Sequence, residues 1–154
     1  MSDANGPEGV SIESVVEQGP DAVIFADRDG VIRIWNAAAE RIFGQTREQA
    51  IGQRLDLIVP ERFRDQHWEG YERALGDGET KYAGQSLPTR ALRGGGEQFY
   101  VELSFAIVRG DGGEVVGALA TARDITERFE QERTNRRRLE ELETALKERE
   151  DSGS

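Results

Sequence analysis

The feature that most constrains the fold is a stretch in which apolar side chains recur at every second position. These residues are Phe99, Val101, Leu103, Phe105 and Ile107. Successive side chains of a β-strand point to opposite faces, so the pattern predicts a strand with one buried face. Glycine-rich turns at 94–96 and 110–113 bound it, which predicts a neighbouring strand on each side. We place these at 81–93, broken or bulged near Pro88 because proline cannot donate to a sheet ladder, and at 115–123.

The first half of the chain predicts a hairpin followed by short helices. Apolar strands at 22–26 and 31–35 flank the turn signal Asp27-Arg28-Asp29-Gly30. Helices are expected at 10–18, at 37–43 with Asn36 as cap, after Thr46 with Gln49 as capping box, and from Pro60 to about Leu75. The order predicts an α+β domain: a five-stranded antiparallel sheet with short helices on one face.

The two ends of the chain differ from this core. Residues 1–9 lack apolar periodicity and are predicted to be disordered, residues 10–19 to be a flanking helix, and residues 20–126 to be the core. Residues 127–154 are rich in Glu and Arg and predict a helical tail. Leu139, Leu142 and Leu146 have coiled-coil spacing over about two heptads. A solvated charged helix is the alternative interpretation.

Composition excludes several classes of function. The net charge of −10 argues against nucleic-acid and anionic-membrane binding, and no apolar run approaches a membrane span. We therefore expect a cytoplasmic protein. The chain has no cysteine and one histidine, which leaves no nucleophile–base pair or metal cluster to assemble, and residues 94–96 lack the Lys of a phosphate loop. The chain is not expected to be an enzyme.

Several strings, in their order and spacing, resemble the PAS family of sensory domains: Ala26-Asp27-Arg28-Asp29-Gly30-Val31-Ile32, Trp35-Asn36, Ile42-Phe43-Gly44, Ile51-Gly52, Arg93-Gly94-Gly95-Gly96 and Arg123-Asp124-Ile125-Thr126. The resemblance implies the PAS fold and a pocket for a ligand or cofactor. It also implies a homodimer formed through flanking helices, and output through the C-terminal helix to a downstream signalling protein.

His67 is the candidate ligand-binding residue. Helical spacing places Phe63, His67, Tyr71 and Ala74 on one stripe, so the imidazole is expected to face inward. A buried neutral imidazole can be an axial ligand of haem iron. The alternative is that it satisfies a hydrogen bond within the core.

The same helix resembles that of FixL-type haem-binding PAS sensors. The resemblance implies haem b, with His67 as proximal ligand of the iron and with Tyr71 and Arg73 beside it. Leu87 stands where oxygen-sensing relatives have an arginine, which favours CO or NO as the sensed gas or leaves oxygen weakly held. Arg90 has the opposite face parity. The other predicted cofactor-binding residues are Tyr82, Leu103, Phe105, Ala120 and Ala122.

Other occupants of the pocket remain open. The absence of cysteine excludes the cysteinyl adduct of light-sensing flavin PAS domains and the thioester of photoactive yellow protein. A non-covalent flavin, a lipid-like ligand, or no cofactor in a pure dimerisation or interaction module are the alternatives to haem. Trp35 and Trp68 are interpreted as core or interface aromatic residues rather than cofactor-stacking ones.

Overall fold

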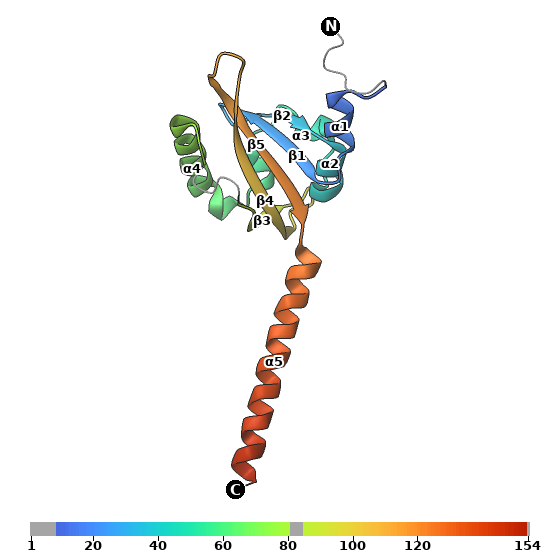
Figure 1. The fold of residues 1–154 in the computed structure, drawn as a ribbon, viewed down its shortest axis with the longest axis vertical. Coiled ribbons are helices and arrows are strands. Elements are labelled where there is room, and N and C mark those ends of the chain that lie inside the picture. The colour runs from blue at the N-terminus through green and yellow to red at the C-terminus, as the bar shows by residue number, and fades with distance from the viewer. Residues whose placement is uncertain (1–8, 81–84, 154) are drawn as a thin grey trace. The chain divides into compact units, whose positions relative to one another are not determined.

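The computed structural model describes residues 9–80 and 85–153. The chain divides after Asp124 into two compact units. The second unit contains one helix, α5 (Thr126–Ser152). The elements described in the first unit are shown in Figure 1: α1 (Ile12–Gln18), β1 (Ala22–Asp27), β2 (Ile32–Trp35), α2 (Ala37–Phe43), α3 (Arg47–Ala50), η2 (Leu55–Ile58), η3 (Glu61–Phe63), α4 (Arg64–Asp77), β3 (Leu87–Leu92), β4 (Gln98–Arg109) and β5 (Val115–Asp124).

The five strands form one antiparallel sheet in the order β2-β1-β5-β4-β3. The last strand of the chain therefore lies in the centre, between the N-terminal hairpin and β4 (Figure 1). This topology confirms the five-stranded antiparallel sheet predicted from the alternating pattern. It also makes β5, which leads directly into α5, the middle strand of the sheet.

The inner face of the sheet is apolar, and its central strand carries only small side chains there. Ala118, Ala120 and Ala122 on β5 lie opposite Ala26, Ile24 and Ala22 on β1. On its other side, β5 presents the same alanines to Ile107, Phe105 and Leu103 on β4. Because alanine projects only one methyl group from the sheet, the centre of this face is hollow relative to its edges.

Aromatic rings close the core at one end of the sheet. Trp35, Phe43 and Phe99 are almost fully buried. The Phe43 ring centroid lies 5.5 Å from the centroid of Trp35 and 5.5 Å from that of Phe99, where the two rings meet edge to face. Such tilted arrangements are favoured between aromatic rings. Trp35 is thus a core residue, as its sequence context suggested.

Asn36 is the buried polar residue of this core. Its Oδ1 accepts hydrogen bonds from the amides of Ala39 at 3.0 Å, which caps α2, and Val23 at 2.9 Å. Its Nδ2 donates to the carbonyls of Val16 at 2.8 Å and Asp21 at 3.0 Å. The predicted cap is confirmed, and the same side chain also joins α1 and β1 to α2.

The middle of the chain differs in part from the sequence predictions. The expected single helix from Pro60 is a short 3-10 helix, η3, followed by α4, and the 3-10 helix η2 before it was not predicted. Pro88 causes no bulge, because β3 is an edge strand and its register with β4 is continuous from Leu87 to Leu92. Gln85 and Ser86 precede β3 rather than belonging to it. Residues 81–84 of the predicted strand, and 1–8 of the predicted disordered segment, lie outside the described residues.

Over residues 9–80 and 85–153, no helix has both the length and the apolar character needed to cross a membrane. The expected helical tail is confirmed as α5, whose large apolar side chains Leu139, Leu142 and Leu146 are all exposed.

Candidate functional site

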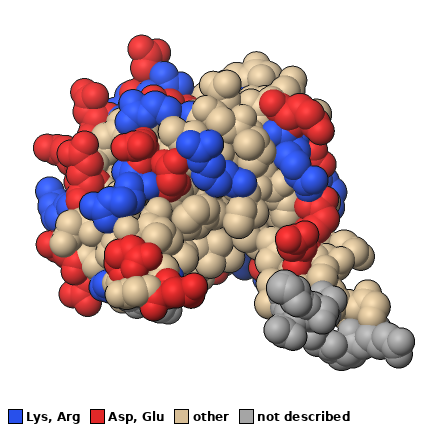
Figure 2. Space-filling model, turned by 90° about the horizontal axis from the view of Figure 1, so that it is seen from above, with Lys and Arg blue, Asp and Glu red and all other residues tan. Residues whose placement is uncertain are grey.

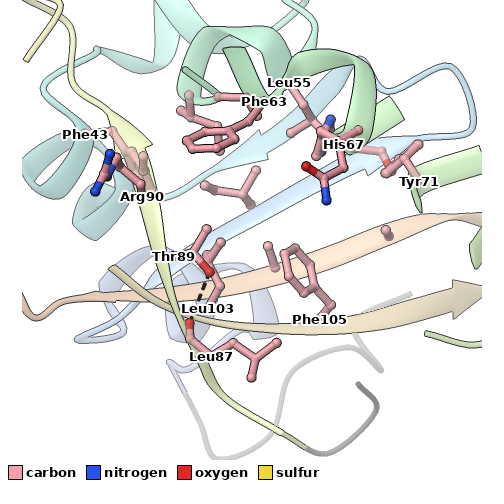
Figure 3. A pocket seen from close by; sticks show the side chains of 18 of the residues that line it. Phe43, Leu55, Phe63, His67, Tyr71, Leu87, Thr89, Arg90, Leu103 and Phe105 are labelled. Carbon is pink, nitrogen blue, oxygen red and sulfur yellow. Dashed lines mark hydrogen bonds between the residues drawn. The ribbon is translucent and has the colours of Figure 1, made fainter. Parts of the chain in front are cut away.

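A cavity of about 520 Å³ lies between the inner face of the sheet and the helices that cover it. Figure 3 shows His67 and Phe63 on the helical side, facing Leu103 and Phe105 on the strand side. Its volume is within the range of small-molecule and cofactor sites. The residues that line it are mostly apolar: Ile24, Ala26, Phe43, Leu55, Ile58, Val59, Phe63, Tyr71, Leu87, Pro88, Ala91, Leu103, Phe105, Ala118, Leu119 and Ala120, with Gln66, His67, Thr89 and Arg90.

His67 of α4 is a polar side chain in the helical wall of this cavity. Its Nδ1 is buried and has no hydrogen-bond partner among the described residues. Burial lowers the pKa of the imidazole, and the nearby charges act in opposite directions: Asp56 raises the pKa and Arg54 lowers it. The imidazole is therefore neutral at physiological pH, which is the form that can bind a metal or accept a hydrogen bond.

Tyr71 lies one turn after His67 and holds α4 against the sheet. Its hydroxyl donates to the carbonyl oxygens of Ala26 at 3.2 Å and Asp27 at 2.5 Å. Burial and the negative charges of Asp27 and Asp29 raise the pKa of the phenol to about 12. The Tyr71 ring stacks on the His67 ring with centroids 5.9 Å apart. Tyr71 thus packs beside the imidazole, while its polar end is already bonded to the backbone.

The opposite wall of the cavity is apolar, as predicted. Leu103 and Phe105 from β4, Leu87 from β3 and Ala120 from β5 all line it. Phe105 is 37% exposed, so it stands where the cavity opens to solvent. Figure 3 marks one hydrogen bond in this wall: the Thr89 hydroxyl donates to the nearby carbonyl of Leu87 at 3.2 Å.

Arg90 contributes to the wall, but its guanidinium is bonded elsewhere. It donates to the Tyr100 hydroxyl at 2.9 Å and lies 5.3 Å from the centroid of the Tyr100 ring. Arg90 and Tyr100 are paired across β3 and β4, and both alternate with residues of the buried face. The opposite face parity predicted for Arg90 agrees with this arrangement. Leu87, and not an arginine head group, occupies the cavity side of β3.

Two of the predicted cofactor-binding residues that the structure describes do not line the cavity, and a third cannot be placed. Arg73 is exposed on α4, two residues beyond Tyr71. Ala122 is buried in the core but does not line the cavity. Tyr82 lies outside the described residues. The structure therefore gathers His67, Tyr71, Leu87, Leu103, Phe105 and Ala120 around one space.

Sequence reasoning missed the residues that position α4. Trp68 bonds to Asp56 of η2, and Arg64 donates to the carbonyls of Val59 at 3.0 Å and Asp56 at 3.2 Å. Leu55 and Ile58 of η2 line the cavity as well. A helix of four residues has no clear periodicity, so no pattern in the sequence could have revealed η2.

The charges of the described residues form no metal cluster and, on the face seen in Figure 2, no patch of one sign. No group of three or more His, Asp or Glu side chains is arranged to hold a metal ion among residues 9–80 and 85–153. Blue and red side chains are interspersed in Figure 2. The described residues thus offer no cluster for a bare metal ion, and the cavity is the candidate site.

Comparison with known proteins agrees with the fold. Residues 16–130 match the family described as PAS fold. The sensor protein FixL of Bradyrhizobium diazoefficiens is 30% identical over 88% of this chain and 26% of its own length. The oxygen sensor protein DosP of Escherichia coli is 26% identical over 88% of this chain and 17% of its own length. The chain thus spans about a quarter or less of these relatives.

A solved structure shows the same architecture. The crystal structure of the PAS domain of a protein from Colwellia psychrerythraea is 26% identical, has a TM-score of 0.65, and covers 75% of this chain and 94% of its own. The family match, over residues 16–130, spans the five strands and the helices that enclose the cavity. From the topology, the cavity and these comparisons, the chain belongs to the PAS family of sensory domains.

Proposed function

We propose that this PAS domain is a sensory module whose cavity binds haem b, with His67 as the protein ligand of the iron. The observation that carries the proposal is the neutral imidazole of His67, whose buried Nδ1 has no hydrogen-bond partner among the described residues, in the wall of an apolar cavity of about 520 Å³. An imidazole in an apolar enclosure is a common way for a protein to hold haem iron. The row of alanines on β5 provides space for a flat ring.

The residues present fit the group on both sides of the cavity. His67 offers the axial nitrogen, and Tyr71 packs against the imidazole ring. Leu87, Leu103 and Phe105 make the facing wall apolar. When bound, haem supplies an iron that can take a diatomic gas at its open position. With the Arg90 guanidinium bonded to Tyr100, the wall favours CO or NO over oxygen, because bound oxygen needs a hydrogen-bond donor more than these gases do.

The similar proteins support a sensory role for this domain, but they do not identify the gas that it would sense. FixL is a sensor protein and DosP an oxygen sensor protein. Both matches include the helix that carries His67, since each covers 88% of the chain. At 30% and 26% identity, the relatives favour ligand sensing in this cavity over a purely architectural role.

A second candidate is a neutral, largely apolar ligand with one polar group. It is favoured by the bonding of the polar side chains in the wall: the hydroxyls of Tyr71 and Thr89 and the guanidinium of Arg90 already bond to protein groups. A ligand rich in polar groups, such as a flavin with its ribityl chain, would leave many of them without partners.

Titration of the purified protein with hemin tests the proposal. We expect a sharp Soret band that saturates at one hemin per chain, because a neutral imidazole is available on the cavity wall. If the spectrum stays that of free hemin, the haem proposal is wrong. If the protein does not bind hemin but dodecanol raises its melting temperature, the apolar ligand proposed as the second candidate is supported.

We also propose that the module works as a homodimer joined through its flanking helices. One side of α5 carries three exposed leucines: Leu139, Leu142 and Leu146 are 59%, 54% and 58% exposed. Such a row of exposed apolar side chains is expected of a helix that pairs with a second helix in a short coiled coil. A change in the cavity can reach α5 because β5 lines the cavity and continues into that helix.

Truncation after Thr126 tests this second proposal. We expect the dimer dissociation constant to rise at least about tenfold, since burial of even one leucine pair contributes on the order of 1.5 kcal/mol or more. Leu142→Glu should act in the same direction, whereas the control Glu141→Gln should not. Sedimentation equilibrium measures the constant, and an unchanged dimer in the truncated chain would contradict the proposal.

A further inference from the structure

Trp68 follows His67 in α4 and connects that helix to η2. Its Nε1 donates to Oδ1 of Asp56 in η2 at 2.7 Å. The guanidinium carbon of Arg54 lies over the Trp68 ring, 3.9 Å from its centroid. A charge-assisted hydrogen bond and a cation–π contact therefore act on one side chain.

The third contact of Trp68 is with the turn between β1 and β2. Gly30 has φ +77°, and a Cβ built on it would lie 2.2 Å from Cη2 of Trp68. The indole thus occupies the space that any other residue would need at position 30. The Gly30 carbonyl also accepts from the Leu55 amide at 3.0 Å. The turn, the segment Arg54–Asp56 and α4 meet at Trp68.

Trp68 also touches the ligand-binding side chain. Its ring centroid lies 4.9 Å from that of His67, with the rings at 72°, and 5.6 Å from that of Tyr71. The Nδ1 of His67 has no hydrogen bond to fix the ring among the described residues. Here the orientation of the imidazole depends on the two aromatic neighbours and on the placement of α4.

We propose that Trp68 is the positioning residue of this cavity: anchored by Asp56 and seated over Gly30, it fixes α4 and so the orientation of the His67 ring. Its effect on ligand affinity rests on the proposed function. Its effect on the imidazole does not, because that effect exists in the protein without ligand. The two parts can therefore be tested separately.

The ligand-free protein gives a direct readout, since it contains one histidine and two tryptophans. Proton NMR at pH 8 then shows one imidazole Hε1 signal, and the indole region shows two Nε1–H signals. We expect Asp56→Ala and Trp68→Phe to shift or broaden the imidazole signal, and Asp56→Ala to shift one indole signal. Asp56→Asn should stay close to wild type, because its amide oxygen can still accept the bond.

A pair of glycine substitutions tests the seat of the indole. Gly30→Ala must displace Trp68, whereas a Cβ at Gly52, with φ +91°, meets nothing within 4 Å. Both alanines carry the cost of a left-handed backbone. We expect only Gly30→Ala to perturb the imidazole and indole signals. Equal spectra for the two variants would overturn the proposal.

Hemin affinity supplies the readout that depends on the proposed function. We expect Asp56→Ala and Trp68→Phe to weaken hemin binding about tenfold, the scale seen when groups that orient a metal ligand are removed, and Asp56→Asn to restore it. Should wild type not bind hemin, the proposed function fails while the imidazole signal still decides the role of Trp68. The role is refuted if that signal is unchanged in all variants, or if Asp56→Asn perturbs it as much as Asp56→Ala.

Discussion

His67→Ala is expected to abolish the haem spectrum of the domain. Because His67 is the one histidine and the chain has no cysteine, its removal leaves neither of the two commonest haem-iron ligands in the protein. Hemin affinity should fall more than about 100-fold, beyond the range associated with loss of an orienting neighbour. The Soret band recorded during titration measures the loss, and circular dichroism shows whether the variant is folded.

Two controls separate iron ligation from a loss of cavity shape. Exogenous imidazole should enter the space left in His67→Ala and restore the Soret band, since the rest of the wall is intact. Glu69→Ala removes an exposed polar side chain of the same helix that does not line the cavity and should leave hemin binding unchanged. Wild-type affinity in His67→Ala would place the haem elsewhere, and failure of imidazole rescue in a folded variant would count against ligation.

Asn36→Ala is expected to have the largest effect on stability. It removes four hydrogen bonds of 2.8–3.0 Å from a residue that is 1% exposed. A buried backbone group left without its partner costs about 1–3 kcal/mol. The total is less than four times this cost, because water can bond to some of the four backbone groups. We expect the free energy of unfolding to fall by about 4 kcal/mol, at the upper end of single substitutions.

Urea denaturation followed by tryptophan fluorescence measures this loss, because Trp35 is buried beside Asn36. Asn36→Asp keeps the acceptors for Val23 and Ala39 but places a carboxylate near the carbonyls of Val16 and Asp21, so it should also destabilise. Asn135→Ala, on an exposed part of α5, is the matched control, with an expected change within about 0.5 kcal/mol. A similar change in both alanine variants would mean that Asn36 does not join the elements as described.

Much of the fold follows from local rules in the sequence. The alternation from Phe99 to Ile107 predicts β4, and the predicted caps at Asn36 and Thr46 both form, the latter as a capping box with Gln49. These signals depend on near neighbours in the chain, where side-chain period and capping chemistry decide the outcome. The hairpin strands and the order of elements follow for the same reason.

The parts that could not be predicted depend on distant contacts. Pro88 is tolerated without a bulge because β3 is at the sheet edge, which is a property of the strand order. The sequence predicts Trp68 only as a core or interface aromatic residue. Its contacts with Asp56 and Gly30 depend on how distant parts of the chain fold together. The helical stripe did predict His67 in the cavity wall, but Arg73, chosen by resemblance alone, is exposed on α4.

The cavity beside the alanines of β5 affects the abundance of this protein in a cell. The apolar wall of a cavity forfeits the dispersion contacts that a filled core would make, and any molecule that binds only the folded chain shifts the unfolding equilibrium toward it. Proteolysis acts on the unfolded fraction. Ligand occupancy would therefore lengthen the lifetime of the chain, so that its abundance, as well as its conformation, carries information about the ligand.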